Sequence, residues 1–191
     1  MNSRVAVALV HYPVTDRRGD LVSTAVTNLD LHDIARTART YGVDRFYVVT
    51  PVVEQQYLVE RILSHWQDGH GAAYNRHRGE ALSLIRIVGS LDEALSDWKI
   101  CAGSAAVPVL TGATRNDGIG TDECRTLLRE VPMLLVFGTG WGLAPELFER
   151  GWTVLEPIRG RGVYNHLPVR AAAAIMLDRL LGMSASNQKT E

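Results

Sequence analysis

The segment MLLVFGTGWG, residues 133–142, decides how the rest of the sequence is interpreted. Its first half, Met133 to Phe137, is an unbroken apolar run, which is typical of a strand buried on both faces of a parallel sheet. Three glycines follow at once, Gly138, Gly140 and Gly142. Glycines let the backbone approach a ligand closely, and open α/β sheets bind ligands at the carboxyl ends of their strands. The segment therefore predicts a binding loop after a central strand.

Shorter apolar runs lie before and after this segment, and helical patterns alternate with them. This alternation predicts an α/β fold with a mainly parallel sheet flanked by helices, in one domain over residues 1–183 with a polar tail at 184–191. The expected strands are 5–10, 45–50, 84–88, 108–111, 133–137 and 153–158. The expected helices are 31–41, 52–66, one that starts at 90, 121–131, 144–150 and 167–181, and the polar segments 15–19, 68–79 and 112–118 are expected loops.

The composition is that of an ordinary globular protein. The 191 residues include 20 basic and 21 acidic side chains, a formal charge of −1, and 46% are hydrophobic. This excludes a disordered chain and a uniformly basic nucleic-acid binder, although a local basic patch remains compatible with it. Cys101 and Cys124 form neither a CxxC pair nor a disulfide framework. Because no segment is typical of a signal peptide or membrane helix, we expect a cytoplasmic protein.

The glycines after residue 137 do not fit a dinucleotide site. Their spacing is GxGxG, whereas the dinucleotide fingerprint is GxGxxG. The segment from Gly142 to Thr153 has room for a helix of about two turns, which is short for a βαβ crossover. A second glycine-containing loop, RGRG at 159–162, follows the last expected strand and leads into an alanine-rich helix. Two such loops at neighbouring strand ends favour a site for a small molecule with polar edges.

Three stretches, in the same order along the chain, resemble the motifs of the SPOUT superfamily of RNA methyltransferases. They are IARTARTYG at 34–42, LVFG at 135–138 with GLAPEL at 142–147, and EPI at 156–158 with LPVRAAA at 167–173. TGATR at 111–115 is a weaker fourth match. Within the superfamily, the sequence is most similar to a bacterial group of domains that also occur fused or adjacent to the tRNA guanine-N1 methyltransferase.

The resemblance implies a fold, a cofactor and an assembly. The C-terminal third would form a deep trefoil knot, and the protein would be a homodimer with the apolar final helix in its interface. S-adenosylmethionine (SAM) would lie in the knot. The residues expected to bind SAM are Thr111, Gly112, Phe137, Gly138, Thr139, Gly140, Trp141, Gly142, Leu143, Glu156, Pro157, Ile158, Asn165, His166, Leu167 and Val169.

Three side chains are the expected catalytic residues: Arg36, Asn165 and Arg170. Arg36 matches the first-motif arginine that acts on the 2′-hydroxyl in ribose methyltransferases of the superfamily. Since arginine stays protonated at pH 7, Arg36 would need unusual desolvation to act as a base, or would orient the hydroxyl and contact phosphate. The asparagine usual before it is replaced by Asp30 or Asp33. The resemblance implies SAM-dependent methylation of tRNA or rRNA, at a ribose 2′-oxygen.

Other features of the motifs leave alternatives open. The second-motif glutamate is absent, and the third-motif Asn and Ser positions are Pro168 and Arg170. A catalytically degenerate SAM-binding module that binds RNA or a protein is therefore the second interpretation. His166 is an alternative base, although a histidine beside a cofactor loop is more often structural.

RNA is the expected partner, and no metal is expected. The basic clusters at 17–18, at 76–78 and at Arg159 with Arg161 would contact phosphates if they shared one face. Asp30, His32 and Asp33 lie close together in the sequence, but their spacing fits no standard metal motif.

Overall fold

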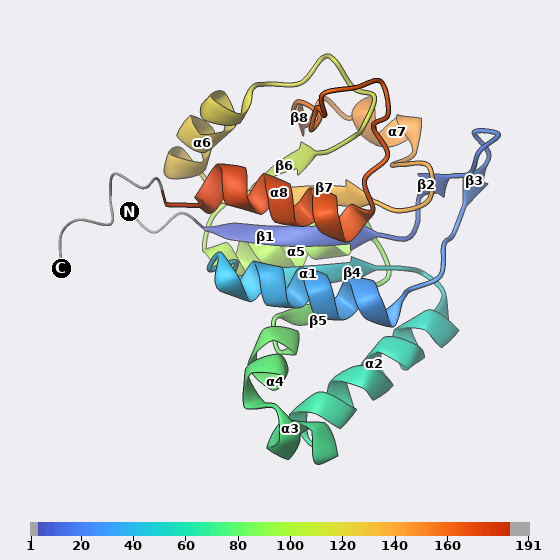
Figure 1. Ribbon diagram of the computed structural model, residues 1–191, viewed down its shortest axis with the longest axis vertical. Helices are drawn as coiled ribbons and strands as arrows, with labels where there is room; N and C mark the ends of the chain where they lie inside the picture. The colour runs from blue at the N-terminus through green and yellow to red at the C-terminus, as the bar shows by residue number, and fades with distance from the viewer. Residues whose placement is uncertain (1–3, 184–191) are drawn as a thin grey trace, which may run out of the picture.

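A computed structural model describes residues 4–183, and a parallel six-stranded sheet runs through them (Figure 1). Its strands are β1 (Val5–Val10), β4 (Arg45–Val49), β5 (Ile85–Val88), β6 (Val107–Leu110), β7 (Met133–Gly138) and β8 (Thr153–Val154). They lie in the order β5-β4-β1-β7-β6-β8, and each neighbouring pair is parallel. A small antiparallel hairpin, β2 (Val14–Thr15) with β3 (Leu21–Val22), stands beside the sheet. The expected α/β class is confirmed, whereas the trefoil knot stays a prediction.

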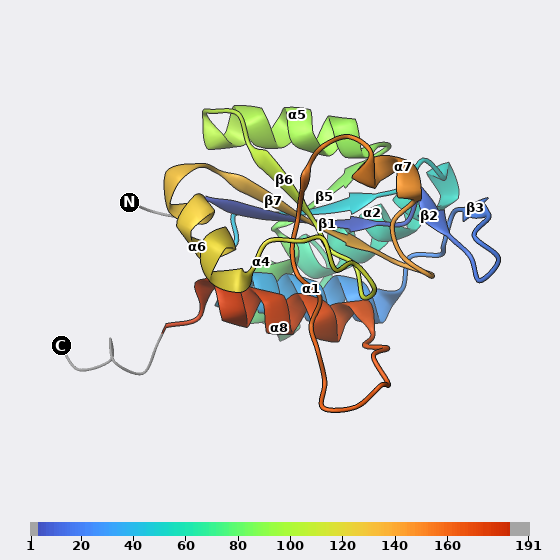
Figure 2. The ribbon, with the colours of Figure 1, turned by 90° about the horizontal axis from the view of Figure 1, so that it is seen from above.

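Helices cover both faces of the sheet, as Figure 2 shows from above. One face carries α1 (Asn28–Thr40), α4 (Arg76–Leu82), α6 (Thr121–Glu130) and α8 (Val169–Leu181), and the other carries α5 (Leu91–Ala102). The remaining helices are α2 (Val53–Gln67), α3 (His70–Tyr74) and α7 (Pro145–Phe148). No helix among residues 4–183 is long and apolar enough to cross a membrane.

The central strand β1 joins two hydrophobic cores. It pairs with β4 on one side and β7 on the other, so that Val7 lies opposite both Phe46 and Leu135. Because successive side chains of a strand point to opposite faces, Val7 and Leu9 pack in the core under α1 and α8, while Ala6 and Ala8 pack in the core under α5. Burial on both faces explains why the strands read as continuous apolar runs.

The start of α5 forms as the sequence predicts. The Ser90 hydroxyl accepts a hydrogen bond from the Glu93 N–H at 3.1 Å. The Glu93 carboxylate in turn accepts one from the Gly89 N–H at 2.8 Å, one residue before the position of a standard capping box. The Glu93 N–H, which the first turn leaves without a helical partner, is thereby satisfied, as is the Gly89 N–H just before the helix.

The prediction of a loop over 68–79 is wrong, because α3 and α4 occupy most of it. Both helices pack around one large side chain, Trp66 at the end of α2. The Arg78 guanidinium lies 4.8 Å from the centre of the Trp66 ring, and a Cβ on Gly71 would come within 2.7 Å of that ring. The Trp66 indole thus provides a packing surface for both helices, which the polar composition of residues 68–79 did not indicate.

The last strand is shorter than predicted. β8 ends at Val154, although a strand to residue 158 was expected. Beyond it, the Glu156 N–H donates to the Ile119 carbonyl at 2.9 Å, and Pro157 has no N–H to continue a ladder. The hairpin β2–β3 was not predicted, since its two-residue strands are too short for a periodic pattern. The predicted polar tail at 184–191 lies outside the described residues.

Candidate cofactor and substrate cavity

A cavity of about 770 Å³ opens at the carboxyl ends of β6, β7 and β8, beside the amino ends of α1 and α8. Four segments that are distant in sequence form its walls. They come from the entry to α1, the turn after β6, the glycine loop after β7, and the long segment that runs into α8. The lining residues are Thr24, Ala25, Thr27, Asp30, 111–114, 137–142, Ile158, 164–170, Ala172 and Met176.

Two glycines make the loop after β7 possible. A Cβ on Gly138 would lie 2.6 Å from the backbone nitrogen of Leu143, far inside van der Waals contact. Gly140 has φ +60°, a conformation that favours glycine, and a Cβ there would lie 2.9 Å from the Thr15 carbonyl oxygen. The chain therefore turns back tightly against the β2–β3 hairpin. Where Gly138, Gly140 and Gly142 line the cavity, they present main-chain atoms to it.

A chain of hydrogen bonds anchors this loop to the end of β1. The N–H and hydroxyl of Thr139 both donate to the Val10 carbonyl, at 3.1 and 2.9 Å. The Thr24 hydroxyl lies 2.5 Å from that of Thr139 and 2.9 Å from Nδ1 of His11. Since the Thr139 proton is already committed, Thr24 donates to Thr139, and His11 donates from Nδ1. Burial lowers the pKa of His11 to about 4, so this histidine is neutral at pH 7.

The opposite wall depends on contacts between loops. Thr111 is held at the end of β6 by its N–H and hydroxyl, which both donate to the Val136 carbonyl, at 3.0 and 2.9 Å. The Asn165 side-chain amide donates to the Ala113 carbonyl at 3.2 Å. Asn165 therefore ties the segment before α8 to the turn after β6.

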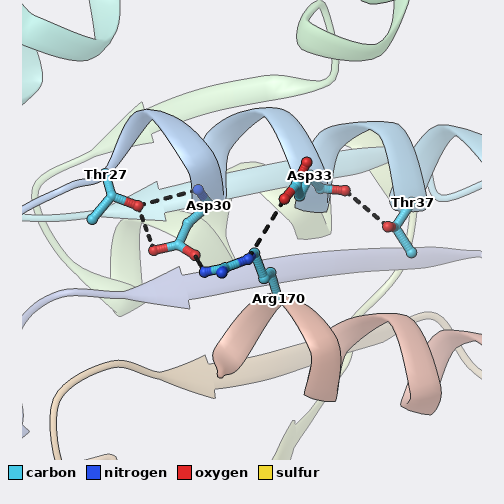
Figure 3. Close-up of polar contacts among 5 residues, drawn as sticks. All are labelled: Thr27, Asp30, Asp33, Thr37 and Arg170. Carbon is cyan, nitrogen blue, oxygen red and sulfur yellow. Dashed lines mark hydrogen bonds and ion pairs between the residues drawn. The ribbon is translucent and has the colours of Figure 1, made fainter. Parts of the chain in front are cut away.

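Charged side chains meet where α8 begins and α1 passes it (Figure 3). Arg170 lies between two carboxylates of α1, with Nη1 3.4 Å from Asp30 Oδ1 and Nε 3.5 Å from Asp33 Oδ2. The Thr27 hydroxyl donates to the other oxygen of Asp30 at 2.6 Å, and the Asp30 N–H donates back to Thr27 at 3.1 Å. Asp30 is held firmly and is largely shielded from water, with 11% of its side chain exposed.

Three aromatic side chains stand at the rim of the cavity. The indole of Trp141 is 5.9 Å from the imidazole of His166, and the phenol ring of Tyr164 is 6.4 Å from the same imidazole, measured between ring centres. Trp141 is 61% exposed and Tyr164 80% exposed. Exposed aromatic rings beside a cavity are suited to stacking against a nucleobase.

A family model described as SAM-dependent RNA methyltransferase matches residues 4–182. The chain belongs to this family. A protein of Oleidesulfovibrio alaskensis named tRNA (guanine-N(1)-)-methyltransferase is 45% identical over 175 residues, which are 92% of this chain and 41% of that protein. The chain thus spans about two fifths of the length of this relative. An uncharacterized protein of Aquifex aeolicus is 38% identical over 94% of this chain and 89% of its own length.

Solved structures confirm the superfamily fold. The SpoU methyltransferase AviRb from Streptomyces viridochromogenes, solved in complex with the cofactor AdoMet, superposes with a TM-score of 0.54 at 18% identity. The alignment covers 95% of this chain and 58% of that chain. This likeness concerns the fold, and it agrees with the SPOUT resemblance of the sequence motifs.

The cavity of this family member fits SAM. Its volume lies within the range of about 300–1,000 Å³ that is typical of small-molecule sites. The apolar side chains of Phe137, Ile158, Leu167 and Met176 suit a flat adenine ring, and the glycine loop exposes main-chain polar groups for its edges. The described residues include no group of three or more His, Cys, Asp or Glu placed to hold a metal ion.

The structure brings most of the expected site residues together. Asn165 and Arg170 line the cavity, as do thirteen of the sixteen expected SAM-binding residues. The other three, Leu143, Glu156 and Pro157, do not line it. The Glu156 carboxylate instead accepts from the N–H and hydroxyl of Thr121, both at 2.9 Å, at the start of α6. These hydrogen bonds lower the pKa of Glu156.

Arg36 does not line this cavity. It lies in a second, smaller hollow on the outer side of α1 and α8, together with Asp33, Thr37, Tyr41 and Ala174. Conversely, the sequence did not predict that Thr24, Ala25, Thr27 and Asp30 line the cavity. The available signal was Thr27 followed three residues later by Asp30, a capping pattern that places a carboxylate at the start of α1.

Proposed function

We propose that this chain transfers the methyl group of SAM to a tRNA. The observation that carries the proposal is the cavity itself, in which a tight glycine loop, a shielded carboxylate and exposed aromatic rings surround one volume of about 770 Å³. The family description and the name of the Oleidesulfovibrio relative support the cofactor and the class of RNA.

The target atom is best sought on a base. The ribose 2′-oxygen that the motifs implied finds no support, and the relative is named for the N1 of guanine. The name describes the whole relative, and this chain matches only 41% of its length. The name alone therefore does not assign the activity to the part that this chain matches. We therefore propose a guanine base as the first acceptor to test, with the ribose oxygen as the competing outcome.

Bound SAM supplies an already activated methyl group, so the chain's own residues have to position the acceptor and remove its proton. Asn165 keeps the two walls of the cavity at a fixed separation through its bond to Ala113. Arg170 is partly exposed at the start of α8, where its guanidinium can contact an RNA phosphate or sugar. Trp141 and Tyr164 are suited to holding an unstacked base at the rim.

We also propose a homodimer in which α1 and α8 face a second copy. The outer side of α8 presents the half-buried small or apolar residues Ala171, Ala174 and Ile175. Arg36 lies beside this face and outside the cavity of its own chain. A catalytic role for Arg36 therefore requires that it reach the cavity of the second copy, so the dimer and this role are tested together by measuring the mass in solution and the activity of Arg36→Ala.

In the decisive experiment, the protein is incubated with bulk bacterial tRNA and with SAM labelled in its methyl group. The nucleosides of the tRNA are then analysed by mass spectrometry. Labelled 1-methylguanosine is expected. A labelled 2′-O-methylnucleoside would move the target to the ribose, and SAM binding without any product would establish the degenerate module. Absence of SAM binding in calorimetry would contradict both.

A pair of glycine variants tests the cavity directly. Gly138→Ala places a methyl group against the Leu143 backbone, so we expect SAM affinity to fall by about tenfold or more, in line with the cost of overpacking. Gly162→Ala is the matched control, because a Cβ there meets nothing within 4 Å. Equal SAM affinity in the two variants would show that SAM binds elsewhere.

A further inference from the structure

One carboxylate in the cavity has no role in the binding of SAM that the motifs imply. Asp30 is the single acidic residue among the described residues that line the cavity. Its Oδ2 accepts the Thr27 hydroxyl at 2.6 Å, whereas its Oδ1 has a long contact of 3.4 Å with Arg170 (Figure 3). One oxygen is therefore tightly bound, and the other retains capacity to accept a proton or a hydrogen bond.

The other candidate bases in the cavity are less well placed. His166 lies at the exposed rim with Trp141 and Tyr164. His11 is fully buried behind Thr24 and is not a lining residue. Asp33, the second carboxylate that contacts Arg170, is 45% exposed and faces the smaller hollow instead. Burial, anchoring and access to the cavity coincide at Asp30 alone among these groups.

We propose that Asp30 accepts the proton that the acceptor atom loses during methyl transfer, and that Arg170 positions it. The inference rests on the proposed methylation and narrows its substrate to acceptors that carry a proton, such as guanine N1. The lone pair of the acceptor forms a bond to the methyl carbon, while the bond from that carbon to sulfur breaks and its electron pair stays on sulfur. The acceptor's proton passes to Asp30 Oδ1 and leaves to solvent after the product.

The charges that face Asp30 suit this role. Arg170 reaches it from α8, Asp33 lies one turn further along α1, and His11 lies behind it at the end of β1. Arg170 contacts both Asp30 and Asp33, so its positive charge is shared and does not fully neutralise Asp30. Since His11 is neutral above about pH 5, it adds no competing positive charge in the working range.

The test compares Asp30→Asn with the wild type by their pH–rate profiles on tRNA. We expect the variant to bind SAM within about twofold of the wild type by calorimetry but to lose a hundredfold or more in kcat, in line with roughly 10²–10⁴ for general base catalysis. Without its base, the variant depends on hydroxide, so its residual rate should rise about tenfold per pH unit between about pH 6 and 8, where the wild type is flat. A merely structural residue would not produce this slope.

Asp33→Asn is the matched control, because it removes the other carboxylate from the same arginine without altering the cavity wall. Its profile should remain as flat as that of the wild type. If Asp30→Asn keeps the wild-type rate or the flat profile, the role of Asp30 is overturned while methylation stands. If the wild type methylates no nucleoside, the proposed function fails first and the inference falls with it. Asp30→Glu, with its carboxylate retained, is the second variant should Asp30→Asn not fold, and a steep profile there would also contradict the proposal.

Discussion

At the scale of single residues, burial sets the charge of a histidine that lies behind the cavity wall. His11 is fully shielded from water, hydrogen-bonded through Nδ1, and without a partner for Nε2 among the described residues. Its pKa falls to about 4 because desolvation disfavours the charged imidazole. Thr24 and Thr139 connect this neutral ring to the glycine loop, so its charge state bears on the shape of the cavity.

His11 makes the protein sensitive to acid. The unfolded state takes up a proton near pH 6.5 and the folded state near pH 4, so unfolding is favoured as the pH falls through this interval. We expect the wild type to lose about 3 kcal/mol of unfolding free energy relative to His11→Gln between these two pH values. Urea denaturation at several pH values measures this difference, with the exposed His166→Gln as control. Parallel curves for wild type and His11→Gln would contradict it.

The sequence identified most residues of the site but not their geometry. Thr111 and the glycine loop were predicted because glycines and motifs mark them. The sequence offered Asp30 only as a replacement for the usual asparagine, since it shows neither the 11% exposure of the Asp30 side chain nor its contact with Arg170, 140 residues away. Glu156 was assigned to SAM for its motif, whereas its carboxylate binds Thr121. Contacts of such long range are properties of the folded chain.

At the scale of elements, the ends of helices position several of the charged side chains. Thr27 caps the start of α1 and also fixes Asp30. Arg170 is the second residue of α8, so the two charged residues meet where two helices start. α6 begins without a cap from its own Gly120. Glu156 supplies that cap from a different part of the chain.

Removal of this distant cap should reduce stability and leave the cavity intact. Glu156→Ala deprives the first turn of α6 of its hydrogen-bond acceptor, a loss of about 1 kcal/mol by analogy with N-cap residues. We expect a lower Tm and an unchanged Kd for SAM, measured by calorimetry. Glu130→Ala, at the exposed end of the same helix, is the control. A large loss of SAM affinity would restore the motif-based role of Glu156.

Sequence patterns predicted those helices and strands whose formation depends on neighbouring residues in the chain. Ser90 with Glu93 marks the start of α5, and continuous apolar runs mark β1 and β7. α3 and α4 escaped prediction because they depend on a tertiary surface, the Trp66 indole, rather than on their own periodicity. The end of β8 depended likewise on the pairing of Glu156 with Ile119.

At the scale of the whole molecule, the cavity is built from both halves of the chain. Its walls include Thr24 to Asp30 from the first half and residues 111–176 from the second. The sequence predicted the parallel sheet that brings them together, since alternating strands and helices admit few other arrangements. The order β5-β4-β1-β7-β6-β8, which places β7 beside β1, required the structure.

A ligand that contacts all these walls should stabilise the fold as a unit. If SAM binds the native state alone, a SAM concentration of about 100 times Kd adds about 2.7 kcal/mol to the unfolding free energy. We expect calorimetry to show one cooperative thermal transition whose midpoint temperature rises as SAM is added. The shift should be much smaller in Gly138→Ala. A transition that splits on addition of SAM would show that the walls unfold independently.

The place of α8 in the cavity wall has a consequence for the timing of synthesis. A ribosome releases the glycine loop first and Arg170 to Met176 some thirty residues later, at about 5–20 residues per second. Until that helix has emerged, the nascent chain lacks one wall of the cavity and the arginine that contacts Asp30. Under the proposed function, we expect the unfinished protein not to retain SAM, and we expect activity to begin only when its last described helix has emerged.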